Sequence, residues 1–305
     1  MSATVPTDPS RSVTITTLQS AKAAHRPIVM ITAYDAPTAR LVDEAGVDVI
    51  LVGDSLGMVT LGYDSTLPVT LADMLHHTRA VVRGTKHALV VTDMPFMTFQ
   101  ISAEEALRNA GRLIAQGGAG AVKLEGGVRV AATVAKIVEA GIPVMGHVGL
   151  TPQSVHQFGG YRVQAKQTSA ALELIEDCRA LEAAGAFAIV LECIPTELAA
   201  VVSREISIPT IGIGAGGGCD GQVQVFHDLV GMGGDFTPRH ARRYAEIGDT
   251  IRAAVEHYAQ DVRDRAFPQA EQSTAMDPQQ LTEFEARHIS GIAHVADRDN
   301  GTKRG

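Results

Sequence analysis

Residues 27–54, PIVMITAYDAPTARLVDEAGVDVILVGD, contain the pattern that decides the fold. Two short apolar runs rich in valine and isoleucine, 27–33 and 48–54, predict buried strands. Between them, 37–45 has the composition of a helix and is followed by Gly46, a residue type that helix ends favour. A strand, a helix and a second strand in this order are the repeating unit of a parallel sheet.

The same alternation continues along the chain. Strands are expected at 27–33, 48–54, 88–93, 120–126, 143–148, 186–193, 209–214 and 222–227, and helices at 37–45, 71–83, 103–116, 128–140, 169–184 and 197–205. Eight such units within about 250 residues are what a closed (β/α)8 TIM barrel requires. The alternative is an open doubly wound sheet, which usually has fewer strands and a glycine-rich loop after the first one. Here the first strand runs into ITAYDAP, which has no such loop, so a single-domain α/β barrel is favoured.

The chain is expected to divide into three parts. A flexible N-terminus, 1–12, precedes a catalytic (β/α)8 barrel over 13–268. From 269 to 305 the sequence becomes rich in Gln, Asp, Glu, Arg and His, which predicts a C-terminal extension that is partly helical or disordered. One helix is expected within it, at 278–294.

Composition narrows the class of function. The 305 residues, 45% of them hydrophobic and 20% charged, are enough to bury a sizeable core. A formal net charge of -8 gives no reason to expect a nucleic acid or an anionic membrane as a partner, so a small molecule is favoured. Three cysteines are too few for a disulfide framework, and no apolar segment suggests a signal peptide or a membrane span. A cytoplasmic protein is therefore expected.

Acidic side chains stand where the predicted strands end. Active sites of such barrels lie at the C-terminal ends of the strands, so these residues are the first candidates. They are Asp54 in LVGDS, Asp93 in VVTDMP, Glu125 in VKLEGG and Glu192 in IVLECIP, together with Lys123 and with His147 in PVMGHVG. Because side chains alternate along a strand, Lys123 and Glu125 point to the same side.

Each of these residues also has an ordinary structural explanation. Asp54 can cap the following helix, and Asp93 can serve the turn at Met-Pro. Glu125 can be a loop acid with Lys123 as its salt-bridge partner, and a histidine can simply donate to a backbone carbonyl. Glu192 is harder to explain, because burying a lone carboxylate between apolar neighbours is unfavourable. Independent caps would not need to gather several acids on one rim, so a shared function is the better interpretation.

Clustered carboxylates repel one another, and a divalent cation is the usual means of offsetting that repulsion. Hard oxygen ligands without a cysteine or a histidine pair predict Mg²⁺, with Mn²⁺ or Co²⁺ as substitutes. An ion held by Asp54 and Asp93 can bind an alpha-keto acid and stabilise its enolate, with Lys123 adding positive charge. Glu192, in an apolar setting expected to raise its pKa, suits a general base.

The glycine-rich run GIGAGGGCDGQ, 212–222, allows two interpretations. Late barrel loops often hold phosphate on backbone amides. The run lacks the Lys-Ser/Thr of a P-loop, however, and close packing of the backbone explains its glycines at least as well.

The motifs taken together resemble those of one enzyme family, the ketopantoate hydroxymethyltransferases. The matching stretches, between residues 13 and 268 and in the family order, are ITAYDAP, LVGDSLGM, GYDSTLPVT, TDMPFM, VKLEGG, GHVGLTPQS, FGGY, LECIP, GIGAG and DGQVQVFHD. The resemblance implies a (β/α)8 barrel that transfers a hydroxymethyl group from 5,10-methylenetetrahydrofolate to 3-methyl-2-oxobutanoate. The product would be 2-dehydropantoate (ketopantoate), formed through a Mg²⁺-stabilised enolate in pantothenate and coenzyme A biosynthesis. It also implies a homo-oligomer, often a decamer.

The functional residues of the family fall on the same strand-end cluster. The resemblance places the proton acceptor at Glu192. It places the metal ligands at Asp54, Asp93 and Glu125. It places the substrate contacts at Asp54, Ser55, Asp93 and Lys123, with His147 as a hydrogen-bonding partner of substrate or product.

Two local departures and two alternatives accompany this interpretation. Segment 233–244, GGDFTPRHARRY, differs from the Lys-Phe-rich stretch of the family, and the tail after Pro268 has no counterpart, but neither touches the proposed metal site. The first alternative is another Mg²⁺-dependent barrel enzyme of the phosphoenolpyruvate mutase and isocitrate lyase kind, whose reactive Lys-Lys-Cys-Gly-type loop this sequence lacks. The second is a barrel that only binds a phosphorylated metabolite through 212–218, which would leave the acidic rim unexplained.

Overall fold

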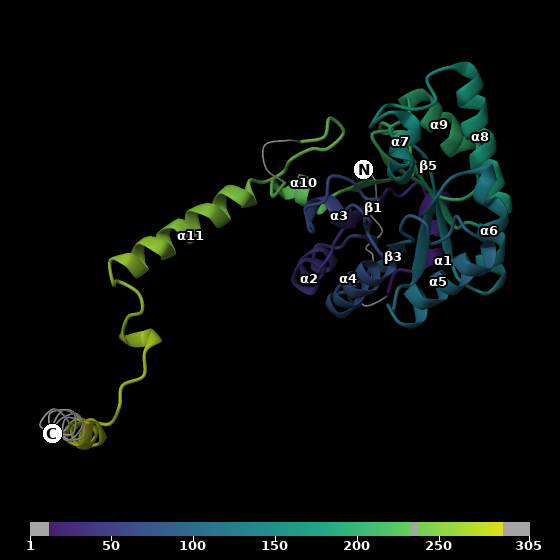
Figure 1. Ribbon diagram of the computed structural model, residues 1–305. Coiled ribbons are helices and arrows are strands. Elements are labelled where there is room, and N and C mark those ends of the chain that lie inside the picture. Colours follow the sequence, from purple (N-terminus) through teal and green to yellow (C-terminus); the bar gives the residue numbers. More distant parts are fainter. Residues whose placement is uncertain (1–11, 234–236, 289–305) are drawn as a thin grey trace, which may run out of the picture. The chain divides into compact units, whose positions relative to one another are not determined.

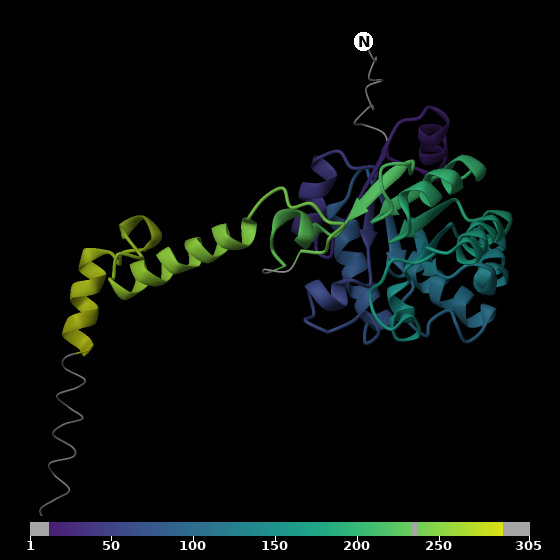
Figure 2. The same cartoon turned by 90° about the horizontal axis from the view of Figure 1, so that it is seen from above.

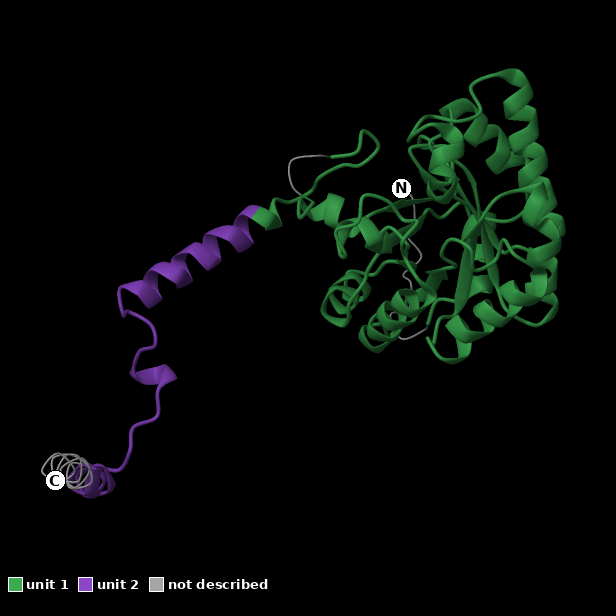
Figure 3. Ribbon diagram, viewed as in Figure 1, with its two compact units in different colours: residues 1–248 green, residues 249–305 purple. Residues whose placement is uncertain are grey.

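The computed structural model describes residues 12–233 and 237–288 (Figure 1). They group into two compact units, one ending at Gly248 and the other beginning at Asp249 (Figure 3). The expected flexible segment 1–12 lies outside the described residues except for Ser12. The expected domain bounds, 13–268 and 269–305, stay predictions.

The strands of the first unit close into one parallel barrel in sequence order, with the last strand paired to the first and helices around them (Figures 1 and 2). They are β1 (Ile28–Thr32), β2 (Val49–Val52), β3 (Leu89–Asp93), β4 (Ala121–Glu125), β5 (Val144–Gly149), β6 (Ala188–Glu192), β7 (Thr210–Ile213) and β8 (Gly221–Gln224). This topology confirms the predicted (β/α)8 barrel.

The helices of the strand–helix units agree with the sequence predictions to within one residue at each end. They are α2 (Ala36–Glu44), α4 (Leu71–Gly84), α5 (Ala103–Ala115), α6 (Val128–Glu139), α8 (Thr168–Ala183) and α9 (Thr196–Glu205). Further short elements follow the ends of strands: α3 (Leu56–Val59), the 3-10 turn η1 (Pro152–Ser154), α7 (Val155–Phe158) and α10 (Phe226–Val230).

Some elements differ from expectation. The strand expected at 222–227 is the shorter β8, because Phe226 already begins α10. No element was predicted for α1 (Ile15–Ala23), α11 (Ile247–Arg263) or the 3-10 turn η2 (Ala270–Gln272), nor for the short α3, η1, α7 and α10. In the tail, residues 278–288 are helical, and the remainder of the helix expected at 278–294 lies outside the described residues.

Side-chain caps explain why several helices begin where they do. The Asp35 carboxylate accepts a hydrogen bond from the Thr38 amide at the start of α2. Thr70 and Asp73 form a reciprocal capping box at the start of α4, and Ser102 caps α5. Such caps satisfy amides that have no partner inside the helix, which fixes the loop that leads from each strand end into the helix.

Apolar side chains pack in two layers, one inside the barrel and one between the barrel and its helices. The inner cluster includes Leu18 and Ala21 of α1. The Lys22 ammonium donates to the carbonyls of Ser203 and Ile208 and forms an ion pair with Asp220, which directly precedes β8. Helix α1 therefore closes the N-terminal end of the barrel, and the opposite end is left for polar side chains.

Candidate active site

The C-terminal ends of five consecutive strands, β2 to β6, supply one cluster of polar side chains. Its members are Asp54 just after β2, Asp93 at the end of β3, Lys123 and Glu125 in β4, His147 in β5 and Glu192 at the end of β6. The first five are at most 7% exposed, and the side chain of Glu192 is 15% exposed. The structure thus brings together all the strand-end residues that the sequence singled out.

Asp93 is held by its neighbours on both sides. Asp93 and Lys123 are register partners on β3 and β4, so their side chains project to the same side, and Lys123 Nζ lies 2.7 Å from Asp93 Oδ1. The Asp54 amide donates to Asp93 Oδ2 at 3.0 Å. Although burial alone would lower the pKa of Lys123, the surrounding carboxylates raise it, so this lysine is charged. The ordinary structural explanation for Lys123 was a salt bridge with Glu125. In the structure its ion pair is with Asp93 instead.

Glu125, His147 and Glu192 form a continuous line across the site. His147 Nδ1 lies 3.5 Å from Glu125 Oε1, and His147 Nε2 lies 3.1 Å from Glu192 Oε2. Burial and the charge of Lys123 lower the pKa of His147, but the two nearby glutamate carboxylates outweigh them and raise it to about 9. The imidazole therefore contacts two carboxylates instead of a backbone carbonyl, and the surroundings of Glu192 are polar on this side.

The negative charge of the Asp54 carboxylate is unfavourable in its surroundings. Burial raises the pKa of Asp54 well above its usual range, and the nearby charges of Asp93 and Glu125 raise it further, against the opposing effects of Lys123 and Gln153. Ser55 occupies the N-cap position of α3, and the Asp54 side chain bonds to Gln153 instead of capping that helix. The site is therefore short of positive charge.

Two residues of the site were not singled out from the sequence. The Tyr34 hydroxyl, in the ITAYDAP motif after β1, is 2.9 Å from Ser55 Oγ, and burial raises the pKa of this phenol. Gln153, in the GLTPQS motif, donates from its side chain to Asp54 Oδ2 and from its backbone to Glu125 Oε2. Both residues lie in loops that follow strand ends, and this position could have identified them. They were missed because the sequence prediction rested on charged side chains, and neither tyrosine nor glutamine is charged.

The carboxylates fit a magnesium ion that takes few protein ligands. Mg²⁺ is usually bound through one or two carboxylates together with water and substrate oxygens. Asp54 and Asp93 provide such a pair, and the buried Asp93 Oδ1 makes no hydrogen bond beyond its ion pair with Lys123. Both oxygens of Glu125 face protein groups, and no set of three or more His, Cys, Asp or Glu side chains among the described residues is arranged for a metal. Both oxygens of Asp93 also face protein groups, so Asp54, Asp93 and Glu125 all stay candidate ligands.

The glycine-rich run 212–222 packs tightly against α9. A Cβ on Gly216 would lie 2.3 Å from the Thr196 side chain, and one on Gly218 would lie 2.7 Å from the Ala200 Cβ. Side chains of any size would clash there, so close packing explains these glycines without a phosphate.

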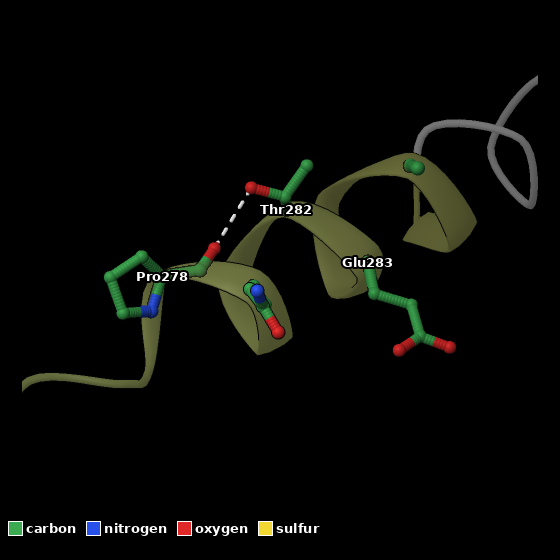
Figure 4. Close-up of a pocket in the computed structure, with 5 residues that line it drawn as sticks. Pro278, Thr282 and Glu283 are labelled. Atoms are coloured by element: carbon green, nitrogen blue, oxygen red, sulfur yellow. Dashed lines mark hydrogen bonds between the residues drawn. The ribbon is translucent and has the colours of Figure 1, made fainter.

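A shallow hollow in the second unit has a different character (Figure 4). It is formed by one helical segment, through Pro278, Gln279, Thr282, Glu283 and Ala286. The Thr282 hydroxyl donates to the Pro278 carbonyl at 2.9 Å within the same helix. One acid and a hydroxyl that is already bonded offer little for catalysis, so the strand-end cluster is the candidate active site.

The family model of ketopantoate hydroxymethyltransferase matches residues 12–270 of the chain. The chain belongs to this family. A Dehalococcoides mccartyi (strain CBDB1) protein named 3-methyl-2-oxobutanoate hydroxymethyltransferase is 59% identical over 271 residues, covering 89% of this chain and 97% of the relative. A protein of the same name from Carboxydothermus hydrogenoformans is 56% identical, and the match covers 88% of this chain and 98% of the relative. One from Enterococcus faecalis is 55% identical, and the match covers 84% of this chain and 93% of the relative.

Solved structures with a similar fold are more distant in sequence. A phosphonopyruvate hydrolase in complex with oxalate and Mg²⁺ has a TM-score of 0.57 at 14% sequence identity. The match covers 93% of this chain and 98% of the hydrolase chain. A 2,3-dimethylmalate lyase of the PEP mutase/isocitrate lyase superfamily has a TM-score of 0.54 at 20% identity, with coverage of 94% and 98%. At such identities the likeness shows the barrel fold alone, so it does not favour the lyase or mutase alternative.

No helix among the described residues is both long enough and apolar enough to span a membrane.

Proposed function

We propose that this protein transfers a hydroxymethyl group from 5,10-methylenetetrahydrofolate to 3-methyl-2-oxobutanoate and so forms 2-dehydropantoate (ketopantoate) for pantothenate biosynthesis. The observation that carries the proposal is the 59% identity to a relative named for this activity, over nearly the whole length of that relative. The buried acidic cluster supports it, because the reaction needs a carbanion equivalent next to a keto group, and such a site can generate one.

The keto acid would bind at the ends of β2, β3 and β4. Asp54 and Asp93 would hold Mg²⁺, with Glu125 as an outer or weaker ligand. When bound, Mg²⁺ would polarise the keto oxygen and stabilise the negative charge that develops there. The Lys123 ammonium, 2.7 Å from Asp93, adds a fixed positive charge beside the same oxygen, and Ser55 contributes a hydroxyl that the Tyr34 hydroxyl holds in place.

Glu192 would act as the base that removes the proton from C3 of the keto acid. Its side chain is the most exposed of the acids in the cluster, so a substrate can reach it. His147 Nε2, 3.1 Å from Glu192 Oε2, orients the carboxylate and can hydrogen-bond the substrate or product. Once the proton is on Glu192, C3 can attack the methylene carbon delivered by the folate. The new carbon–carbon bond forms as the bonds from that carbon to the folate nitrogens break, water supplies the hydroxyl group, and tetrahydrofolate leaves.

The assembly and the location are also proposed from the family. We infer a cytoplasmic homo-oligomer, a decamer by resemblance. An exposed apolar stripe on α11 supports self-association, because such a stripe is unfavourable in water unless another surface covers it.

A direct assay tests the reaction. The full-length protein is incubated with 3-methyl-2-oxobutanoate and 5,10-methylenetetrahydrofolate, and ketopantoate is measured with Mg²⁺ and after its removal by EDTA. The proposal predicts product with Mg²⁺, little after chelation, and recovery when Mg²⁺ is restored. Absence of ketopantoate with Mg²⁺ and both substrates present would contradict it.

A further inference from the structure

Gln153 makes contacts with three neighbouring strand ends at once. It lies in η1, after β5, and is 7% exposed. Its side-chain Nε2 donates to Asp54 Oδ2 at 2.9 Å and to the Met94 carbonyl at 3.0 Å, and its backbone amide donates to Glu125 Oε2 at 3.0 Å. One neutral residue thus restrains Asp54 and Glu125, and it also contacts Met94, the residue after Asp93.

The orientation of the Gln153 amide is fixed by a second glutamine. Gln100 Nε2 donates to Gln153 Oε1 at 3.0 Å. With Oε1 occupied as an acceptor, the two hydrogens of Nε2 point to Asp54 and Met94. A flipped amide would place Oε1 against the Asp54 carboxylate and the Met94 carbonyl, two acceptors that would repel it.

We infer that Gln153 is a positioning residue for the divalent-cation site, holding the Asp54 carboxylate in the orientation that receives the ion. This inference rests on the proposed function, in which Asp54 is a metal ligand. Among the described residues, Gln153 donates the hydrogen bond that the Asp54 carboxylate accepts. The bond goes to Oδ2, and Oδ1 accepts no hydrogen bond from these residues. Residues behind the ligands typically change metal affinity in this way, because they restrict how a ligand can rotate.

Gln153 is uncharged, which suits a residue that holds a metal ligand in place. A lysine or arginine at this position would neutralise Asp54 and compete with the cation for its carboxylate. An amide restrains the carboxylate through a hydrogen bond without cancelling its charge, so the carboxylate still gains from a bound cation.

The test measures metal affinity in the absence of both substrates. The full-length protein and three length-matched variants, Gln153→Met, Gln100→Met and Gln157→Met, are titrated with Mn²⁺, and free Mn²⁺ is followed by its electron paramagnetic resonance signal. Thermal unfolding of each variant is recorded in parallel. Gln157 is exposed in α7, a few residues from Gln153, and serves as the control.

We expect Gln153→Met to weaken Mn²⁺ binding by about 10- to 100-fold. Gln100→Met leaves Gln153 in place but frees its amide, so it weakens binding by a smaller factor, and Gln157→Met binds as the unmodified protein does. A folded Gln153→Met protein with unchanged Mn²⁺ affinity would overturn the inference and leave the proposed function standing.

Two further outcomes are also decisive. If Gln153→Met fails to fold, unchanged Mn²⁺ affinity in Gln100→Met overturns the inference, and weakened affinity supports it. If the unmodified protein binds no Mn²⁺, the metal site of the proposed function fails, and the inference fails with it.

Discussion

At the scale of single residues, the site is governed by how its buried charges are compensated. Burial and the nearby charges of Asp93 and Glu125 raise the pKa of Asp54, and Lys123 is a buried cation that opposes this effect. An uncompensated buried charge is strongly unfavourable, so each group of this cluster depends on the presence of the others.

Removing the buried cation should destabilise the protein. Lys123→Met leaves Asp93 Oδ1 without its ion pair, and we expect a loss of about 3 kcal/mol in the free energy of unfolding. Urea unfolding followed by circular dichroism measures the change. The matched control is Arg179→Met, which breaks an exposed ion pair with Glu205 and should change stability by less than about 1 kcal/mol. Equal effects for the two variants would contradict this account.

His147 should be protonated at neutral pH in the metal-free protein. Its pKa is about 9 in the folded protein, against 6.5 when unperturbed, because the nearby carboxylates of Glu125 and Glu192 outweigh burial and the charge of Lys123. A raised pKa means that this contribution to stability is complete below pH 6.5 and is lost as the pH rises through about 9. Nuclear magnetic resonance of the labelled imidazole checks this, and titration near 6.5 would contradict it.

The strand-end acids could be predicted from the sequence, but their partners could not. Asp54, Asp93, Glu125 and Glu192 are visible because a carboxylate directly after an apolar run has few structural reasons to be there. Which residue pairs with Lys123 depends on the register between β3 and β4, and no local pattern in the sequence encodes that register. Gln153 was missed for a related reason, since its contacts join residues about 60 and 100 positions apart in the chain.

At the scale of elements, the way each strand passes into its loop determines where the site residues lie. Gly149 ends β5 with a φ of +92°, and it is the register partner of Glu192 at the end of β6. A Cβ at this position would lie 2.3 Å from the Glu192 carbonyl oxygen. The turn therefore requires glycine both for its backbone conformation and for the close approach to β6.

Adding one methyl group at Gly149 should disturb both stability and the proposed base, Glu192. We expect Gly149→Ala to lower the free energy of unfolding by about 2–4 kcal/mol, because backbone strain and the clash with β6 add together. Activity should also fall, since the clash moves Glu192. The control is Gly111→Ala in α5, where an added Cβ has no neighbour within 4 Å and should stabilise the helix by about 0.5–1 kcal/mol. Chemical unfolding compares the two, and a neutral Gly149→Ala would contradict this account.

The repeating elements were predictable because each strand and helix repeats one pattern of composition. Helix α11 escaped prediction even though its apolar residues have helical spacing, because it follows the last strand–helix unit and was assigned to the end of the barrel. Helix α1 was missed because its sequence, ITTLQSAKA, has little amphipathic pattern, and its helical state depends on packing into the barrel end.

At the scale of the whole molecule, α11 carries the clearest sign of self-association. Ile251, Val255, Tyr258 and Val262 follow one another at intervals of three or four residues, so they form one stripe, and each is at least 44% exposed. The helix from Asp249 onward and the residues beyond it belong to the second compact unit. Composition predicted helical or disordered structure only for 269–305 and identified no partner surface there.

A charge in the stripe should reduce the size of the assembly. We expect Val255→Glu to shift the protein to a smaller species, because burying a carboxylate in an apolar interface is unfavourable. Size-exclusion chromatography with light scattering gives the mass. His257→Glu, on the opposite face of the helix, adds the same charge and should leave the mass unchanged. An unchanged mass for Val255→Glu would show that the stripe does not hold subunits together.

The central claim is that Glu192 removes the C3 proton of a keto acid bound beside Asp54 and Asp93. The most direct measurement follows exchange of that proton with deuterium by nuclear magnetic resonance, using 3-methyl-2-oxobutanoate and Mg²⁺ in D₂O without the folate. The account predicts exchange with the unmodified protein and a loss of about 100-fold or more with Glu192→Gln, while that variant still binds the keto acid. Exchange at the unmodified rate in Glu192→Gln would contradict it.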